Sequence, residues 1–325
     1  MKNKKKTIMV IIIFLIVCVL GYFFTNKDSN KKLEKTSIRL KWITQSQFAG
    51  FYTAEEEGIY DKYGLDVTID PAGPNISPIQ SVVSGNDEFG IAGADQVIAA
   101  IDNDVPIVAI GVIYRETPES LVSLKSSKIK KPKDLIGKTV GVIYGNDEVL
   151  YRMFLKKNGI KESEVNEVPA ITGISQIMTN KVDAKMAYEM NDAVLLKLDG
   201  QEVNLIKFRD YGIKVYGDTI FTTKELAENN PEKVRKFVKA SFEGWNKVKE
   251  NPEKAVNTLI KINSSLDYDH QLGYLKESLP IIFTDDKLGY SNKKVWQNLI
   301  DDLYDFGTIK NKHKAKEIFT NKYLD

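Results

Sequence analysis

The sequence of 325 residues has one cysteine, Cys18, and two histidines, His270 and His313. A single cysteine can form neither a disulfide framework nor a zinc cluster. Both histidines fall in the polar C-terminal region, which argues against a histidine-based metal site or catalytic triad. We therefore predict no metal site and no bound cofactor.

The chain also lacks an excess of charge of one sign. Its 46 basic and 44 acidic residues give a net charge of +2, and without a strongly basic surface we predict no nucleic-acid partner. No internal repeat of fixed period is visible. The length is sufficient for two domains that each bury a core, and we expect a monomer.

Residues 1–24 predict a signal peptide or membrane anchor. Several lysines precede an apolar run from Ile8 to Phe24, which is near the lower limit of about 17–25 residues for a membrane-spanning helix. The lysines predict a cytoplasmic N-terminus, with the rest of the chain outside. Cys18 follows a lipobox-like leucine but a bulky Val17, so an uncleaved anchor and a lipid on Cys18 both stay open. Either would hold the protein at the outer face of the cytoplasmic membrane.

Residues 25–36 are polar and charged without periodicity, which predicts a flexible tether. From Ser37 onward, predicted strands and helices alternate, a pattern typical of a mainly parallel sheet flanked by helices. The apolar run from Val105 to Tyr114 predicts a central strand buried on both faces.

The chain changes character after Tyr114 and again near Tyr216, and we place a crossing between two lobes at each point. This predicts lobe 1 from residues 37–117 plus 217–325 and lobe 2 from 118–216. Two α/β lobes joined by two crossings form a cleft that can close on a ligand by hinge bending.

Residues 39–67 open the first lobe with a predicted strand over 38–42, a polar and aromatic bend, a helix over 53–58 and a strand over 65–69. Such a bend between strand and helix is where open α/β sheets place ligands. Trp42 at the strand end is a candidate stacking platform, with core packing as the alternative. The other candidates on this wall are polar or aromatic: Gln45, Gln47, Phe48 and Tyr52.

Further candidate ligand contacts follow strands or lie at the crossings. Asp95 stands at a predicted helix start, either as the N-cap or as a ligand contact. A turn after the strand over 139–143 combines an aromatic side chain with a glycine that allows close backbone approach. The remaining candidates share a place at a strand end or crossing: Tyr114, Glu116, Tyr144, Gly145, Asn146, Tyr188, Glu189 and Asp218.

Four segments together resemble bacterial substrate-binding proteins of ABC importers for thiamine pyrimidine precursors, riboflavin, alkanesulfonates and nitrate. They are LKWITQSQFAGFYTAEEEGIYDKYGLDV, SGNDEFGIAGADQ, KKPKDLIGKTVGV and NPEKVRKFVKASFEGW. The resemblance implies a two-lobed periplasmic-binding-protein fold of type II, preceded in this chain by the N-terminal membrane segment. It also implies capture of a small aromatic nitrogen heterocycle and its delivery to an ABC permease. The family has a glutamate at the position of Glu189.

The resemblance is strongest to the branch that contains the thiamine pyrimidine synthases of thiamine biosynthesis. Those enzymes carry a lysine that holds pyridoxal phosphate and, four residues later, a histidine consumed as substrate. The matching positions in this chain are Ala92 and Gln96, and the region 211–222 lacks the cysteine-rich run of the enzymes. Without an amine at position 92 no Schiff base can form there, so we predict a binding protein rather than an enzyme.

Two alternatives remain open at this point. The first is a pyrimidine synthase that depends on pyridoxal phosphate and iron. The second is a binder of sulfonate, nitrate or a similar anion, which would need a cationic pocket. The sequence places only two cationic residues, Arg115 and Lys41, near the predicted cleft. We therefore favour a ligand that is a heterocycle over one that is an anion.

Overall fold

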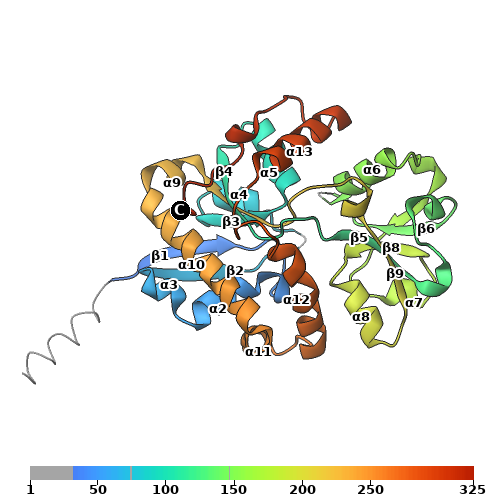
Figure 1. Cartoon of the computed structure of the whole chain (residues 1–325), viewed down its shortest axis with the longest axis horizontal. Helices are drawn as coiled ribbons and strands as arrows, with labels where there is room; N and C mark the ends of the chain where they lie inside the picture. The colour runs from blue at the N-terminus through green and yellow to red at the C-terminus, as the bar shows by residue number, and fades with distance from the viewer. Residues whose placement is uncertain (1–31, 74, 146) are drawn as a thin grey trace, which may run out of the picture. The chain divides into compact units, whose positions relative to one another are not determined.

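The computed structural model describes residues 32–73, 75–145 and 147–325 (Figure 1). The predicted anchor over 1–24, with Cys18, and most of the predicted tether lie outside these ranges. Within them, no helix is long and apolar enough to cross a membrane. Residues 35–325 form one compact unit.

Two five-stranded sheets organise this unit, as the alternating pattern predicts. The first has the order β2-β1-β3-β10-β4 and the second the order β7-β6-β8-β5-β9. We call the parts that carry them the first and the second lobe. The strands of the first sheet are β1 (Glu34–Arg39), β2 (Leu65–Asp70), β3 (Phe89–Ala92), β4 (Ile107–Val112) and β10 (Thr219–Thr223). Those of the second are β5 (Glu119–Leu124), β6 (Thr139–Val142), β7 (Asn166–Pro169), β8 (Ala184–Tyr188) and β9 (Val203–Lys207).

Each sheet contains one strand that runs against its neighbours. In the first sheet β10 pairs antiparallel with β3 and β4, whereas β1 and β3 are parallel. In the second sheet β5 pairs antiparallel with β8 and β9, whereas β6 is parallel to β7 and β8. Both reversed strands are the first to follow a crossing, and both lie fourth in their sheet. The strand positions agree with the predicted lobes, whose boundaries at 117/118 and 216/217 stay a prediction.

Helices flank both sheets (Figure 1). Those of the first lobe are α2 (Ala49–Glu56), α3 (Ile59–Lys62), α4 (Pro78–Val83), α5 (Ala94–Asp102), α9 (Lys224–Asn229), α10 (Pro231–Glu250), α11 (Pro252–Ile262), α12 (Tyr268–Ile282) and α13 (Lys293–Phe306). Those of the second are α6 (Glu148–Lys157), α7 (Ser175–Met178) and α8 (Asp192–Leu198).

The starts of α10 and α11 are readable in the sequence. Asn230 and Asn251 accept hydrogen bonds from the backbone N–H groups of Lys233 and Lys254, and a proline follows each asparagine as the first helical residue. An asparagine cap satisfies a free helical N–H, and proline at this place loses no hydrogen bond. Both helices therefore begin at the residues that the asparagine–proline pairs in the sequence indicate.

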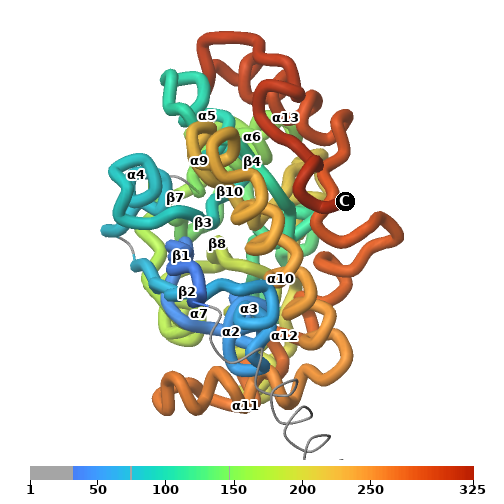
Figure 2. The backbone as a smooth tube through the Cα atoms, turned by 90° about the vertical axis from the view of Figure 1, so that its left-hand side faces the viewer, coloured from blue at the N-terminus to red at the C-terminus, as the bar shows by residue number. Residues whose placement is uncertain are grey.

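Helix α10 lies against α2 and α3 (Figures 1 and 2). Two glycines permit the close approach of α10 and α2: a Cβ atom added at Gly244 would lie 2.2 Å from the carbonyl oxygen of Gly50. Nearer the start of α10, the ring of Phe237 stacks on that of Phe89 in β3 with centroids 3.9 Å apart. These aromatic side chains are fully buried and form the core of the first lobe.

The first strand and the first helix of the first lobe begin and end at other residues than predicted. Strand β1 begins at Glu34, inside the predicted tether, and ends at Arg39, before the predicted strand end at position 42. Helix α2 begins at Ala49, after a single 3₁₀ turn over Ser46–Phe48. This turn is fixed by Gln271, whose side-chain oxygen accepts from Ser46 N at 2.7 Å. A partner so distant in the sequence leaves no local signal.

Candidate functional site

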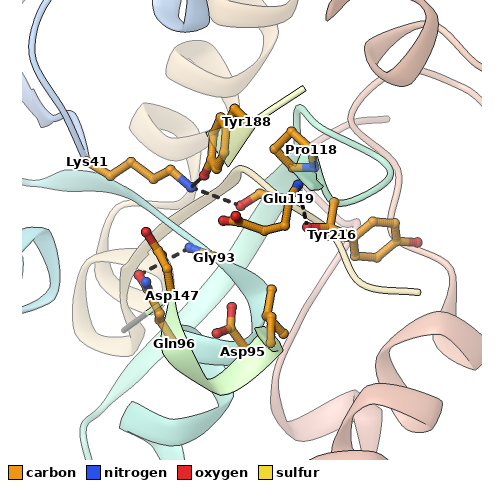
Figure 3. A pocket seen from close by; sticks show the side chains of 12 residues that line it. Lys41, Gly93, Asp95, Gln96, Pro118, Glu119, Asp147, Tyr188 and Tyr216 are labelled. Carbon is orange, nitrogen blue, oxygen red and sulfur yellow. Dashed lines mark hydrogen bonds between the residues drawn. The ribbon is translucent and has the colours of Figure 1, made fainter. Parts of the chain in front are cut away.

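A small pocket lies where the two lobes meet the crossings (Figure 3). Its volume is about 10 Å³, which is near the minimum that holds one water molecule. The lining residues of the first lobe and of the crossings are Lys41, Gly93, Asp95, Gln96, Thr117, Pro118, Tyr216 and Gly217. Those of the second lobe are Glu119, Asp147, Leu150 and Tyr188.

Lys41 joins the two lobes across this pocket. Its ammonium group donates to the phenol oxygen of Tyr188 at 2.6 Å and lies 2.8 Å from a carboxylate oxygen of Asp218. Its ammonium group meets the hydroxyl end of Tyr188 and not the face of the ring, because it lies 5.2 Å from the ring centroid, close to the line of the C–O bond. Burial alone would lower the pKa of Lys41, but Asp218 and other carboxylates offset it and raise the pKa above its usual value.

Three predicted site residues form a polar chain that leads to Lys41. Gln45 donates to Gln47 at 2.7 Å, and Gln47 donates to the carboxylate of Asp218 at 2.9 Å. Asp218 is fully buried. These side chains support Lys41 from behind the pocket rather than lining it.

The lining carries more carboxylates than cations. Asp95, Glu119 and Asp147 interact electrostatically with one another, and Lys41 attracts each of them. Burial and the charge of Asp147 raise the pKa of Asp95 to about 6. The same two causes raise the pKa of Glu119 well above its usual value, and burial also raises the pKa of Asp147. The site is therefore electronegative.

Asp95 is not the N-cap of its helix. The N-cap of α5 is Gly93, which makes Asp95 the second helical residue, and the side chain of Gln96 accepts from Gly93 N at 3.4 Å. The carboxylate of Asp95 instead lines the pocket. This corrects the capping interpretation of Asp95.

Glu116 and Glu189 bind a side chain that the sequence analysis did not consider. Arg209 lies 2.9 Å from the carboxylate of Glu116 and 2.8 Å from that of Glu189, and it donates to the carbonyl oxygen of Thr117 at 3.2 Å. Lys207 also lies 3.1 Å from Glu189. The two glutamates thus hold the first crossing to the second lobe, and neither lines the pocket described above.

Three predicted aromatic contacts are engaged elsewhere. Phe48 is fully buried in the core of the first lobe. The phenol of Tyr52 hydrogen-bonds with the hydroxyl of Thr44 at 2.9 Å. Tyr114 is fully buried at the first crossing and donates to Ser278 at 3.2 Å. In this conformation none of the three has a free surface for a ligand.

Of the other predicted residues, those that the structure describes do not line this pocket. Trp42 is half-buried and packs against the first-lobe core. Tyr144 is exposed, and Asn146 lies outside the described residues. Gly145 lines a second hollow of about 260 Å³, which shares Asp95 and Gln96 with the pocket. The apolar walls of this hollow are Pro78, Ile79, Ala99 and Val149.

The sequence analysis missed Glu119 and considered Lys41 only as a possible anion contact, whereas Asp147 belongs to the turn after the strand over 139–143 that was predicted to face the ligand. A positional signal existed for each of them. Glu119 is the first residue of β5 after the crossing, Asp147 directly precedes α6, and Lys41 closely follows β1. Strand ends next to crossings are where ligand sites form in α/β sheets.

The lining also bears on cofactor chemistry. Among the described residues no group of three acidic, histidine or cysteine side chains is arranged to hold a metal ion. Ala92, at the position of the cofactor lysine in the synthases, is fully buried in β3. Lys41 is the amine that lines the pocket, and its raised pKa keeps it protonated.

The profile of the family described as NMT1/THI5 like matches residues 45–255. The chain belongs to this family. The resemblance drawn from the four sequence segments is thereby confirmed.

Relatives and solved structures agree with this assignment. The riboflavin-binding protein RibY of Chloroflexus aurantiacus is 24% identical over 91% of this chain and 88% of its own length. The formylaminopyrimidine-binding protein of Halalkalibacterium halodurans is 26% identical over 92% of this chain and 93% of its own. The periplasmic aliphatic sulphonate binding protein SsuA of Escherichia coli superposes with a TM-score of 0.71 at 17% identity, covering 87% of this chain and 91% of its own. The chain thus has the two-sheet α/β fold of these binding proteins.

Proposed function

We propose that this protein is an extracytoplasmic substrate-binding protein of an ABC importer. It captures a small aromatic nitrogen heterocycle between its lobes and delivers it to a permease. The observation that carries the proposal is the electronegative interlobe pocket, in which Tyr188 offers an aromatic face and Asp95 and Glu119 offer hydrogen-bond acceptors. The names of the two binding-protein relatives support the same class of ligand.

Closure of the lobes would couple capture to delivery. The pocket holds little more than one water molecule, so a heterocycle requires the lobes to separate before it enters. A ligand that contacts both lobes then favours the closed state through its higher affinity for it. Lys41 and Tyr188 are the contacts that ligand entry would rearrange, because their hydrogen bond spans the pocket.

The ligand sits in the pocket and in the hollow that shares Asp95 and Gln96. The hollow of about 260 Å³ is just below the range of about 300–1,000 Å³ usual for small-molecule sites. This size favours a single-ring, pyrimidine-like ligand over a flavin. Gly145 lines this hollow, and Trp42 and Asn146 remain predicted ligand contacts.

The anion-binding alternative is disfavoured by the charge of the lining. The lining offers an anion three carboxyl groups, Asp95, Glu119 and Asp147, and a lysine that already pairs with Asp218, so it gives a sulfonate or nitrate little cationic support. Arg115 does not supply a free cation, since its guanidinium group is 2.6 Å from Asp286 and donates to Tyr290 O at 2.7 Å. The synthase alternative is disfavoured because the chain has Ala92 where the enzymes have the lysine that holds pyridoxal phosphate. Lys41 is not a substitute, since its raised pKa keeps it protonated and a protonated amine is unsuited to forming a Schiff base.

The predicted membrane attachment fits this role. An anchor over residues 1–24, or a lipid on Cys18, would keep loaded binder close to the permease and raise its effective concentration there. The proposal further expects that the protein acts as a monomer.

A thermal-shift panel of pyrimidines, flavins, sulfonates and nitrate tests the proposal. A ligand that binds only the folded state stabilises it by about 2.7 kcal/mol at a hundred times its dissociation constant. We expect a pyrimidine to raise the thermal midpoint and Trp42→Ala to reduce the rise without unfolding the protein. If only sulfonates or nitrate raised the thermal midpoint, the hypothesis of a heterocycle ligand would be rejected. If the purified protein showed the absorbance of a lysine-bound pyridoxal, the hypothesis of a binding protein would be rejected in favour of the enzyme.

A further inference from the structure

One carboxylate of the pocket lacks the partner that its burial demands. Glu119 is only 3% exposed, and its Oε2 atom has no hydrogen-bond partner among the described residues. Figure 3 shows this carboxylate turned toward Lys41 and Asp147 in the pocket. Burying a carboxylate without a hydrogen-bond partner lowers the stability of the folded state, and such groups are rare in folded proteins. A bound group that donates to Glu119 would remove this cost.

The neighbouring charges specify the kind of group. Lys41 is already engaged by Asp218 at 2.8 Å and by Tyr188 at 2.6 Å. Asp95, Glu119 and Asp147 have no ion-pair partner within 4.0 Å among the described residues. One ammonium group therefore faces four carboxylates if Asp218 is counted. Burial and neighbouring carboxylates raise the pKa values of Asp95, Glu119 and Asp147, which shows that positive charge is scarce around these groups.

The surroundings favour an organic cation over a metal ion. The carboxylates of the described residues do not converge as a metal-binding group of three. The adjoining hollow has apolar walls, including Ile79 and Val149, and shares the lining residues Asp95 and Gln96 with the pocket. A ligand with a charged head and a flat, largely apolar body would fill both spaces.

We propose that the ligand carries an ammonium or amidinium group, which binds Glu119 and Asp147 while its ring occupies the hollow beside Asp95. This inference rests on the proposed function and narrows it from a nitrogen heterocycle to a positively charged one. Charge-assisted hydrogen bonds to a buried carboxylate are about twice as strong as neutral ones. On binding, the ammonium or amidinium group would also supply the hydrogen-bond donor that Glu119 Oε2 lacks.

Two pyrimidine probes that share one ring test the inference by titration calorimetry on the full chain. The first carries an aminomethyl group, which is an ammonium at pH 7.5, and the second carries a hydroxymethyl group, which is neutral. We expect the ammonium probe to bind at least about tenfold tighter, the effect of one charge-assisted contact. Glu119→Gln should abolish this preference, whereas Glu202→Gln, on an exposed surface pair, should keep it.

The outcomes separate this inference from the proposed function. Equal affinity for the two probes would overturn the cation while leaving a heterocycle binder. Binding of neither probe, together with a shift by nitrate or a sulfonate, would reject the proposed function itself. A shift with magnesium or calcium chloride alone that competes with the ammonium probe would assign a metal ion to the site and overturn the organic cation.

A second variant keeps the test decisive if Glu119→Gln fails to fold. Asp147→Asn removes the other carboxylate that faces the ammonium group and should reduce the preference at least about threefold. Preference retained in full by a folded Glu119→Gln or Asp147→Asn protein would contradict the assignment of the cation to these two side chains.

Discussion

Lys41 and Tyr188 are 147 residues apart in the sequence, and their side chains are joined by a hydrogen bond of 2.6 Å. Lys41 follows the first strand of the first lobe, whereas Tyr188 ends β8 in the second. The contact therefore links the lobes directly across the pocket. It also places Lys41 between the phenol oxygen of Tyr188 and the carboxylate of Asp218, 2.8 Å away.

The pair of Lys41 and Asp218 should couple strongly in a double-mutant cycle. Among the described residues, Lys41→Met leaves the fully buried carboxylate of Asp218 with Gln47 as its side-chain donor. Loss of one partner of a buried pair costs about 3–5 kcal/mol. Adding Asp218→Asn should restore much of that stability in urea unfolding. The control Lys125→Met breaks a pair in which both side chains are more than half exposed, and it should change stability by less than about 1 kcal/mol. A coupling energy near zero would contradict the prediction.

Asp95 should make stability fall as the pH rises. Its pKa is raised from 3.8 to about 6, so the folded state binds its proton more tightly than the unfolded state does. The resulting stabilisation is complete below about pH 4 and is lost as the pH passes 6. Relative to wild type, Asp95→Asn should gain up to about 3 kcal/mol at pH 7.5 and little at pH 4. Urea unfolding of both proteins across this range measures the difference. A difference independent of pH would refute the role of the buried Asp95 carboxylate in this pH dependence.

Arg209 should stabilise the junction of the first crossing with the second lobe. Arg209→Gln removes two ion pairs and the hydrogen bond to Thr117 O, while Lys207 still neutralises part of the charge of Glu189. We expect a loss of about 2–3 kcal/mol in the free energy of unfolding. Arg235→Gln is the matched control, because its partner Glu232 is mostly exposed, and it should change stability by less than about 1 kcal/mol. Equal effects of the two substitutions would show that Arg209 has no special role.

Gly244→Ala should destabilise the protein even though alanine is the better helix former by about 1 kcal/mol. The added methyl group would lie 2.2 Å from the carbonyl oxygen of Gly50, so α10 and α2 would have to separate. Overpacking of this kind costs about 1–3 kcal/mol and occasionally more. At Gly73 no described heavy atom lies within 4 Å of the added Cβ, so Gly73→Ala should be neutral or slightly stabilising. Thermal midpoints compare the two, and a more stable Gly244→Ala protein would disprove the tight contact.

The sequence predicted those features that depend on local chemistry. Asparagine followed by proline marks the starts of α10 and α11, and alternating apolar patterns locate most strands. Asp95 and Tyr188 were predicted because they end or follow strands beside the cleft, and both line the pocket. These signals are local, since caps, strand ends and apolar periodicity all act within a few residues.

The rest depends on partners that are distant in the sequence. Glu189 was predicted to contact a ligand, but in the structure its carboxylate binds Arg209, 20 residues away. The turn before α2 is fixed by Gln271, 225 residues from Ser46. The importance of Glu119 follows from the missing partner of one oxygen atom, which only the folded arrangement reveals.

The two crossings are bonded to each other, and this constrains how the lobes can move. Gly217 N donates to Tyr114 O at 2.9 Å, and Ile113 N donates to Asp218 O at 2.8 Å. Because these hydrogen bonds join them, we expect the two crossings to bend together. The relative motion of the lobes that meets least resistance is then a rotation about one axis through the crossings. Asp218 and Glu119 lie on or next to the crossings, so a ligand held there acts close to the pivot of this rotation. A shift of a fraction of an ångström at the pivot therefore becomes a displacement many times larger at the far ends of the lobes.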